Sequence, residues 1–310
     1  MDEKPFIPPR FDLLADLRPA HRGGDGVLTY FGIEYAKIDR FRPLELDLMI
    51  PTSGQRALVV YIHGGAWRNG SRHENWVSGP IWRDLLNAGL AVASIDYRLS
   101  GEAPFPACVN DAKAAVRWLR RFGSELGVST DAIGVLGESA GGHIAAFLGL
   151  NTTVTELEGG DGVLGESTEV QAAVVWYAPT DLSRMDEQAK LNGGIPHNSA
   201  DSPESLLVGG ALQQKPDRTA WAGPTNHVSG AAAPFMLIHG RDDRVVPYQQ
   251  STEFAEALRG AGVSADLQII EGADHVFKGV DREPIIERSA RFLASQLSDA
   301  VPSWARPTVS

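Results

Sequence analysis

The amino-acid sequence predicts an α/β protein with one mainly parallel sheet of about eight strands, helices on both faces and a small cap. Short, almost continuously apolar runs alternate along the chain with segments whose apolar residues recur at helical spacing. Such runs are typical of parallel strands buried on both faces, and their alternation with helices is typical of a layered α/β domain. We therefore expect residues 1–310 to form a single domain with a large core.

The first elements expected are two antiparallel strands at the sheet edge, which follow a proline-rich N-terminal arm over residues 1–26. They cover residues 28–38 and 44–50, and the second contains the alternating string Leu44-Glu45-Leu46-Asp47-Leu48. The buried parallel strands are expected in the apolar runs that follow, over residues 57–62, 91–95, 133–136, 172–177, 235–238 and 267–270.

Helical spacing of apolar residues predicts the helices that cover this sheet. They are expected over residues 81–86, 112–122, 144–150, 254–258 and 285–297. Residues 179–234, rich in Gly, Pro, Asn and Ser, break the alternation. Ser202 followed by Pro203 predicts the start of a short helix there. Because long structureless loops are rare inside compact domains, we expect this segment to form a cap insertion, with residues 1–26 sharing in it.

Composition and charge exclude several classes of function. The formal net charge is −11, from 39 acidic and 28 basic residues, which argues against nucleic acid or an anionic membrane as a partner. No apolar run approaches the ~18 residues of a membrane helix, and the N-terminal residues lack the apolar segment of a secretory signal. We therefore expect a cytoplasmic protein.

No metal or other cofactor is expected. The sequence contains no His and Cys cluster with zinc-ligand spacing, and the string Glu158-Gly159-Gly160-Asp161-Gly162 lacks the spacing of a calcium or phosphate loop. The single cysteine, Cys108, excludes an intramolecular disulfide. It lies in an apolar context, so we expect a buried, unreactive thiol.

Ser139 is the strongest candidate for a nucleophile. It lies in the string Gly137-Glu138-Ser139-Ala140-Gly141, between the strand expected over 133–136 and the helix expected over 144–150. Strand, Gly-x-Ser-x-Gly and helix in this order are the sequence form of a nucleophile elbow, a sharp turn that lifts the hydroxyl above the carboxyl edge of a sheet. The flanking glycines are needed because a side chain two positions to either side would clash.

A serine hydroxyl needs a base to take its proton and an acid to orient that base. Of the eight histidines, only His275 follows the last expected strand, so we predict His275 as the base. The acid should follow the preceding strand, where Asp242 and Asp243 both occur, and spacing does not choose between them. His63 and His239, which each close a strand, are interpreted as structural.

An oxyanion formed from a substrate carbonyl needs backbone N–H groups already aimed at it. Ala140, directly after the serine, is one expected donor, and Gly65 and Ala66, in the loop after the strand at 57–62, are the others. Gly64 is expected to secure that turn. The residues expected to line the substrate pocket are Gly64, Trp67 and Glu138.

Two further groups of residues are assigned a place without a chemical role. Asp96, Arg98 and Asp111 are expected to form one structural charge network beneath the serine turn. For three tryptophans, Trp76, Trp82 and Trp221, the sequence leaves two alternatives open: they line the pocket, or they fill the core and the cap.

These residues resemble the α/β-hydrolase superfamily, and within it the hormone-sensitive-lipase-like and the acetyl-xylan or feruloyl type (BD-FAE-like) esterases. The matching strings are His63-Gly64-Gly65-Ala66-Trp67, Asp96-Tyr97-Arg98-Leu99, Pro104-Phe105-Pro106-Ala107, Gly137-Glu138-Ser139-Ala140-Gly141-Gly142-His143 and His239-Gly240-x-x-Asp243-x-x-Val246-Pro247. The resemblance implies that the acid is Asp243, three residues before Val-Pro, and that Asp242 is a solvated or loop-bracing carboxylate. Ala66 departs from the third glycine of many lipase-like members but keeps a backbone donor.

Together these features predict a cofactor-free serine hydrolase that cleaves carboxylic esters with short to medium acyl groups through an acyl-enzyme. The expected triad is Ser139, His275 and Asp243, covered by residues 179–234 and 1–26. The same triad would serve an amidase, an arylformamidase-like hydrolase or a small peptidase. A binding protein on the hydrolase scaffold is the alternative from another class, and the intact triad argues against it. The expected partner is a small ester, and a homodimer is compatible with the sequence.

Overall fold

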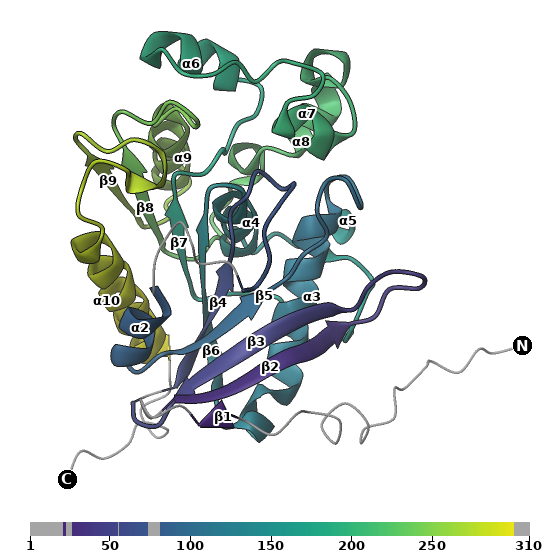
Figure 1. Cartoon of the computed structure of the whole chain (residues 1–310), viewed down its shortest axis with the longest axis vertical. Helices are drawn as coiled ribbons and strands as arrows, with labels where there is room; N and C mark the ends of the chain where they lie inside the picture. Colours follow the sequence, from purple (N-terminus) through teal and green to yellow (C-terminus); the bar gives the residue numbers. More distant parts are fainter. Residues whose placement is uncertain (1–20, 23–26, 55, 74–80, 301–310) are drawn as a thin grey trace, which may run out of the picture.

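The computed structural model describes residues 21–22, 27–54, 56–73 and 81–300, and these form a nine-stranded sheet with helices on both faces (Figure 1). The strands are β1 (His21–Arg22), β2 (Val27–Ala36), β3 (Leu44–Pro51), β4 (Ala57–Ile62), β5 (Ala91–Ile95), β6 (Ser129–Glu138), β7 (Ala172–Trp176), β8 (Phe235–Gly240) and β9 (Ala265–Ile270). Their order in the sheet is β1-β2-β3-β5-β4-β6-β7-β8-β9.

The pairing of the strands follows the two patterns seen in the sequence. β1, β2, β3 and β5 pair antiparallel in that order, whereas β5, β4, β6, β7, β8 and β9 pair parallel. All residues of β4, β5, β7 and β8 are buried, as expected for strands covered on both faces. The predicted fold class is therefore confirmed, with β1 as a two-residue addition that the sequence pattern did not indicate.

The described residues form α-helices and short 3₁₀ turns between and after the strands. They are α2 (Ile81–Asn87), α3 (Ala107–Phe122), η1 (Gly123–Leu126), α4 (Ala140–Gly149), α5 (Thr155–Glu158), α6 (Met185–Asn192), α7 (Pro203–Val208), η2 (Leu212–Gln214), α8 (Pro216–Trp221), η3 (Pro224–His227), α9 (Gln249–Gly260), η4 (His275–Phe277) and α10 (Glu283–Ala300), where η marks a 3₁₀ turn.

Two apolar layers hold the helices to the sheet. Alternate residues of β4 point to opposite faces, so Leu58 and Val60 belong to the cluster that contains α3, α4 and α9. Val59 and Tyr61 belong instead to the cluster that contains α2 and α10. Cys108 is buried in the first layer, and burial raises the pKa of its thiol to about 12, which agrees with the expected unreactive cysteine.

Residues 179–234 are structured between β7 and β8. They contain α6, α7 and α8, which lie beyond the carboxyl ends of the strands at the top of Figure 1. The helix predicted to start at Ser202 is present as α7, and Ser202 Oγ accepts a hydrogen bond from Ser205 N at 3.1 Å. The N-terminal arm, apart from the two residues of β1, lies outside the described residues, as does Trp76. Within the described ranges, no helix is both long and apolar enough to cross a membrane.

Candidate active site

Ser139 occupies the turn that joins β6 to α4. Its backbone has φ 52° and ψ −120°, a strained conformation for a residue other than glycine. A Cβ added at Gly137 would lie 2.2 Å from the carbonyl oxygen of Gly141, and one added at Gly141 would lie 2.1 Å from that of Ile62. The turn holds the strained serine because its glycines allow these close backbone approaches, as the elbow pattern predicts.

The loops after β8 and β9 bring Asp243 and His275 to this serine. His275 Nε2 lies 3.2 Å from Ser139 Oγ, and His275 Nδ1 lies 2.7 Å from Asp243 Oδ2. Asp242 is exposed, so Asp243 is the carboxylate beside the imidazole. Because Nδ1 faces a carboxylate, it carries the ring proton, and the lone pair of Nε2 faces the serine hydroxyl.

The Asp243 carboxylate is buried but well supplied with donors. Its Oδ1 accepts hydrogen bonds from the backbone N–H groups of Val245 and Val246, both at 2.8 Å. Burial alone would raise the pKa of this carboxyl, but hydrogen bonds from His239 and His275 outweigh burial and hold its pKa well below its usual range. The group therefore carries its negative charge at neutral pH.

Asp274 links the loop that carries His275 to the loop that carries Asp243. Its Oδ1 accepts hydrogen bonds from the backbone N–H of His275 at 2.7 Å and from that of Arg244 at 3.1 Å. Sequence reasoning gave this residue no role. The sequence feature that could have indicated this role is an aspartate directly before a helical turn, a position where the side chain often accepts a hydrogen bond from the backbone of that turn.

The loop after β4 passes beside the serine. A Cβ added at Gly64 would lie 3.5 Å from Ser139 Cβ, so this backbone lies against Ser139. Gly65 and Ala66 follow with φ 110° and 55°. Gly65 has to be glycine, since a Cβ there would lie 2.2 Å from the carbonyl oxygen of Asn69. The expected oxyanion donors Gly65 and Ala66 thus lie in a tightly constrained loop next to the serine.

Two residues expected to line the pocket have buried side chains instead. Trp67 is 2% exposed, and its indole N–H lies 3.3 Å from Nδ1 of His143. Glu138 is 5% exposed, and its carboxylate accepts hydrogen bonds from the hydroxyl groups of Tyr61 and Tyr177, the latter at 2.6 Å. The motif strings fix where these residues stand in the chain but not the direction of their side chains. Both brace the backbone around Ser139 from the interior.

His143 connects the elbow helix to the segment over the strand ends. Its Nε2 lies 2.7 Å from the carbonyl oxygen of Ala222, and its Nδ1 faces the indole N–H of Trp67. Burial lowers the pKa of His143 to about 4. The ring is therefore neutral at pH 7, donates from Nε2 to Ala222 and accepts at Nδ1.

Two of the three unassigned tryptophans pack on other aromatic rings. Trp221 meets Phe105 edge to face at a centroid distance of 4.9 Å and stays half-buried. Trp82 meets Tyr61 in the same manner at 4.3 Å, on the α2 side of the sheet.

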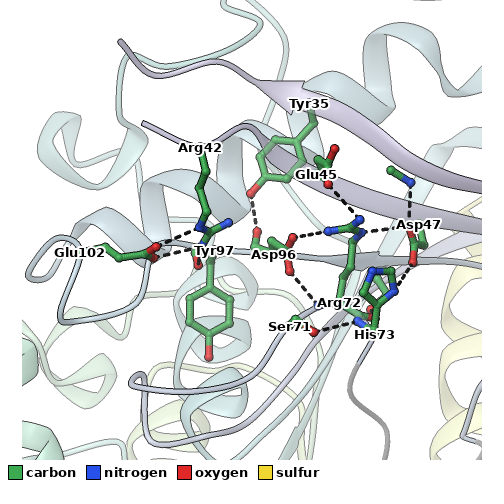
Figure 2. Close-up of polar contacts among 12 residues, drawn as sticks. Tyr35, Arg42, Glu45, Asp47, Ser71, Arg72, His73, Asp96, Tyr97 and Glu102 are labelled. Atoms are coloured by element: carbon green, nitrogen blue, oxygen red, sulfur yellow. Dashed lines mark hydrogen bonds and ion pairs between the residues drawn. The ribbon is translucent and has the colours of Figure 1, made fainter. Parts of the chain in front are cut away.

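The last part of the loop after β4 that the structure describes is fixed by ion pairs to β3 and to the end of β5 (Figure 2). The guanidinium of Arg72 contacts Asp96 at 2.6 Å, Glu45 at 2.9 Å and Asp47 at 3.0 Å. The backbone of Arg72 is also held, because its N–H donates to Asp96 at 2.8 Å and its carbonyl accepts from Ser94 Oγ at 2.7 Å. Arg72 therefore ties this loop to β3 and to the end of β5.

The single charge network expected for Asp96, Arg98 and Asp111 is wrong, because these residues belong to two networks. Asp96 pairs with Arg72, whereas Arg98 pairs with Asp111 at 2.6 Å and with Asp161 at 3.2 Å. Asp96 directly follows β5 and pairs with Arg72 of the loop after β4, whereas Arg98 lies two residues further along and pairs with Asp111 of α3.

Tyr97 shows what the segment after β5 contributes to the site. Its hydroxyl donates to the carbonyl oxygen of His63 at 3.1 Å, and its ring stacks on the His63 ring at a centroid distance of 4.4 Å. The Tyr97 side chain thus braces the start of the loop that Arg72 fixes further along the chain. This contact agrees with the structural role expected for His63.

The parallel sheet, the strained serine and the Ser-His-Asp geometry define an α/β-hydrolase fold. The chain belongs to the BD-FAE family, whose model matches residues 46–258. It is 31% identical over 244 residues to the probable carboxylic ester hydrolase LipM of Mycobacterium tuberculosis, covering 76% of this chain and 52% of LipM. The chain spans about half the length of the curated relatives it matches.

Solved structures of esterases are also similar. A truncated form of a carbohydrate esterase from gut microbiota superposes with a TM-score of 0.79 at 29% identity, covering 89% of this chain and 99% of that one. Esterase 2 of Thermogutta terrifontis superposes with a TM-score of 0.66 at 27% identity, covering 92% and 95%. The same Thermogutta esterase has been solved phosphorylated by paraoxon, with a TM-score of 0.64 at 26% identity, covering 87% and 94%.

Proposed function

We propose that this chain is a carboxylic ester hydrolase that works through an acyl-enzyme on Ser139. The observation that carries the proposal is the chain of contacts from Ser139 Oγ to His275 Nε2 at 3.2 Å and from His275 Nδ1 to Asp243 Oδ2 at 2.7 Å. Ser139 itself lies in the strained turn between β6 and α4. The esterase activities of the relatives support the same class of reaction.

In the acylation half-reaction, Ser139 Oγ attacks the ester carbonyl carbon while His275 Nε2 takes the hydroxyl proton. The carbonyl oxygen becomes an oxyanion, for which the N–H groups of Gly65, Ala66 and Ala140 are the proposed donors. The intermediate then collapses, the bond to the alcohol oxygen breaks, and Nε2 returns the proton to the leaving alcohol. An acyl-enzyme ester on Ser139 remains.

In the deacylation half-reaction, water attacks the acyl carbon and His275 Nε2 takes its proton. Collapse of the second tetrahedral intermediate releases the carboxylic acid and returns the proton to Ser139 Oγ. Asp243 stays ionised throughout. It orients the ring of His275 and stabilises the imidazolium that forms in each half-reaction.

Residues 179–234 form the proposed cap over this site and limit the size of the substrate. This segment is hydrogen-bonded in two places to residues that closely follow Ser139 and Asp243 in the chain: Ala222 O accepts from His143 Nε2 at 2.7 Å, and Ile195 N donates to Arg244 O at 2.9 Å. A cap held so closely favours short to medium acyl groups, of about two to six carbons, over long lipid chains.

The test is a panel of p-nitrophenyl esters of rising acyl length, with a p-nitroanilide as the amide control. We expect hydrolysis of short esters and little turnover of the anilide. Ser139→Ala should lower kcat by a factor on the order of 10⁴ to 10⁶ and leave the fold intact, because it removes the attacking oxygen. The matched control is Ser124→Ala, at an exposed serine of η1, which should keep full activity.

Covalent labelling separates this mechanism from its rivals. Paraoxon should inactivate the enzyme with one phosphoryl group on Ser139, located by peptide mass spectrometry. A label on another serine, a fully active Ser139→Ala variant, or a wild-type protein that cleaves no ester would contradict the proposal.

A further inference from the structure

A second imidazole contacts the carboxylate of Asp243. His239 is the penultimate residue of β8 and is fully buried. Its Nε2 lies 3.3 Å from Asp243 Oδ2, the same oxygen that faces His275 Nδ1 at 2.7 Å. The sequence pattern suggested only that His239 closes a strand, so this contact extends its structural interpretation.

The surroundings of His239 fix the direction of its ring. Nε2 also lies 2.9 Å from the carbonyl oxygen of Val246. Since a carbonyl and a carboxylate can only accept, Nε2 carries a hydrogen, which it donates to the Val246 carbonyl with the Asp243 carboxylate as a second acceptor nearby. At the opposite side of the ring, Nδ1 lies 2.7 Å from the hydroxyl of Ser251, a buried residue of α9. The N–H that faces Asp243 is thus held by contacts on both sides of the imidazole.

We propose that His239 is a positioning residue for the triad: its Nε2–H holds the Asp243 carboxylate facing His275 and takes up part of the negative charge of that carboxylate. This inference rests on the proposed function, because it concerns the same triad. When two donors share one carboxylate oxygen, each donor weakens that oxygen as an acceptor for the other. His239 therefore limits how strongly Asp243 stabilises protonated His275.

Other titratable groups surround the triad and stay unchanged in the variants that follow. Asp274 accepts from the backbone N–H of His275, and the ring of Tyr177 packs edge-on against His275 at a centroid distance of 4.9 Å. Tyr177 in turn donates its hydroxyl to Glu138. Asp242 and Arg244 flank Asp243 in the chain and are exposed. A change in pH dependence between variants thus reports on the substituted residue.

His239→Asn and His239→Gln form a matched pair. The amide nitrogen of asparagine reaches about as far as Nδ1, so His239→Asn keeps a contact with Ser251 but gives up the donor to Asp243. The amide nitrogen of glutamine reaches about as far as Nε2 and restores that donor. The measurement is kcat and KM for p-nitrophenyl acetate from pH 5 to pH 9, with folding checked by circular dichroism and thermal unfolding.

For His239→Asn we expect the acid limb of kcat/KM to move to higher pH by about 0.5 to 1 unit, because Asp243 then stabilises protonated His275 more strongly. We also expect kcat to fall about tenfold with KM nearly constant, since the carboxylate is less well oriented. His239→Gln should keep the acid limb of the wild type and most of its kcat. The control His227→Phe, whose Nε2 faces Trp221 O and not the triad, should leave the limb in place.

An unshifted acid limb in folded His239→Asn, or equal losses in the Asn and Gln variants, would overturn the proposal. If His239→Asn does not fold, Ser251→Ala takes its place, since it frees the Nδ1 side of the ring and should shift the limb in the same direction by a smaller amount. No shift in that variant would overturn the proposal as well. Failure of the proposed function itself is separate, because it would appear as an inactive wild type or an active Ser139→Ala.

Discussion

His143 makes the stability of this protein depend on pH. Burial lowers its pKa from 6.5 to about 4, so on acidification the unfolded state binds a proton at this residue before the folded state does. The stability contributed by the neutral ring is complete above about pH 6.5 and is lost as the pH falls towards about 4. At about 1.4 kcal/mol per pKa unit, His143 alone should lower the free energy of unfolding by about 2 kcal/mol between pH 8 and pH 5.

The assay is urea unfolding at pH 8 and pH 5, followed by tryptophan fluorescence, for the wild type and His143→Gln. Glutamine does not titrate, so the wild type should lose about 2 kcal/mol more than the variant between the two pH values. Taking the difference cancels other titrating groups, such as Asp243. Equal losses in the wild type and His143→Gln would refute the reasoning, since they would mean that the ring is already protonated or hydrated in the folded state.

Two further substitutions test the supports of the site. Arg72→Ala should lower the free energy of unfolding by about 3 to 5 kcal/mol, because Asp96 is left buried without its cation. Arg72→Lys should recover only part of this loss in urea unfolding, since an ammonium lacks the planar fork, and full stability of Arg72→Ala would contradict the assignment. Asp274→Ala should lower kcat about tenfold with little change in KM, because the N–H groups of His275 and Arg244 lose their shared acceptor. Asp281→Ala, which removes an aspartate bonded in the same way to a backbone N–H near the start of α10, should keep the wild-type kcat; an equal loss in both variants would reject a specific effect on His275.

The fold could be predicted because burial leaves a local mark on the sequence. A strand covered on both faces is almost continuously apolar, and residues 57–62 and 91–95, in which Ser94 is the one small polar residue, match this pattern in the sequence and are fully buried in the structure. β6 begins at Ser129, earlier than the apolar run at 133–136, because its first residues lie at the strand end and tolerate polar side chains. The apolar residues of 179–234 follow no single helical or strand period, so only α7, which begins with a Ser-Pro pair, could be predicted there.

Ser139 and His275 could be predicted as candidates because their chemistry imposes a local pattern on the chain. A strained turn requires glycines around Ser139, and a base over the sheet edge has to follow the last strand. Spacing could not choose between Asp242 and Asp243, because adjacent residues occupy almost the same place in the chain and differ only in the direction of their side chains. In the structure Asp243 is buried against His275 and Asp242 is exposed.

The supports of the site are contacts between residues far apart in the chain, which no local pattern indicates. Glu138 stands beside Ser139 in the sequence, but its partner Tyr61 is 77 residues away and holds its carboxylate in the interior. Trp67 stands beside the expected oxyanion donors, but it meets His143 at a separation of 76 residues. A residue next to a reacting group in the chain can therefore point away from the substrate and still act on it, because it fixes the backbone that the reacting group depends on. The strain at Ser139 makes such supports necessary, since a strained turn persists only where its surroundings leave it no relaxed alternative.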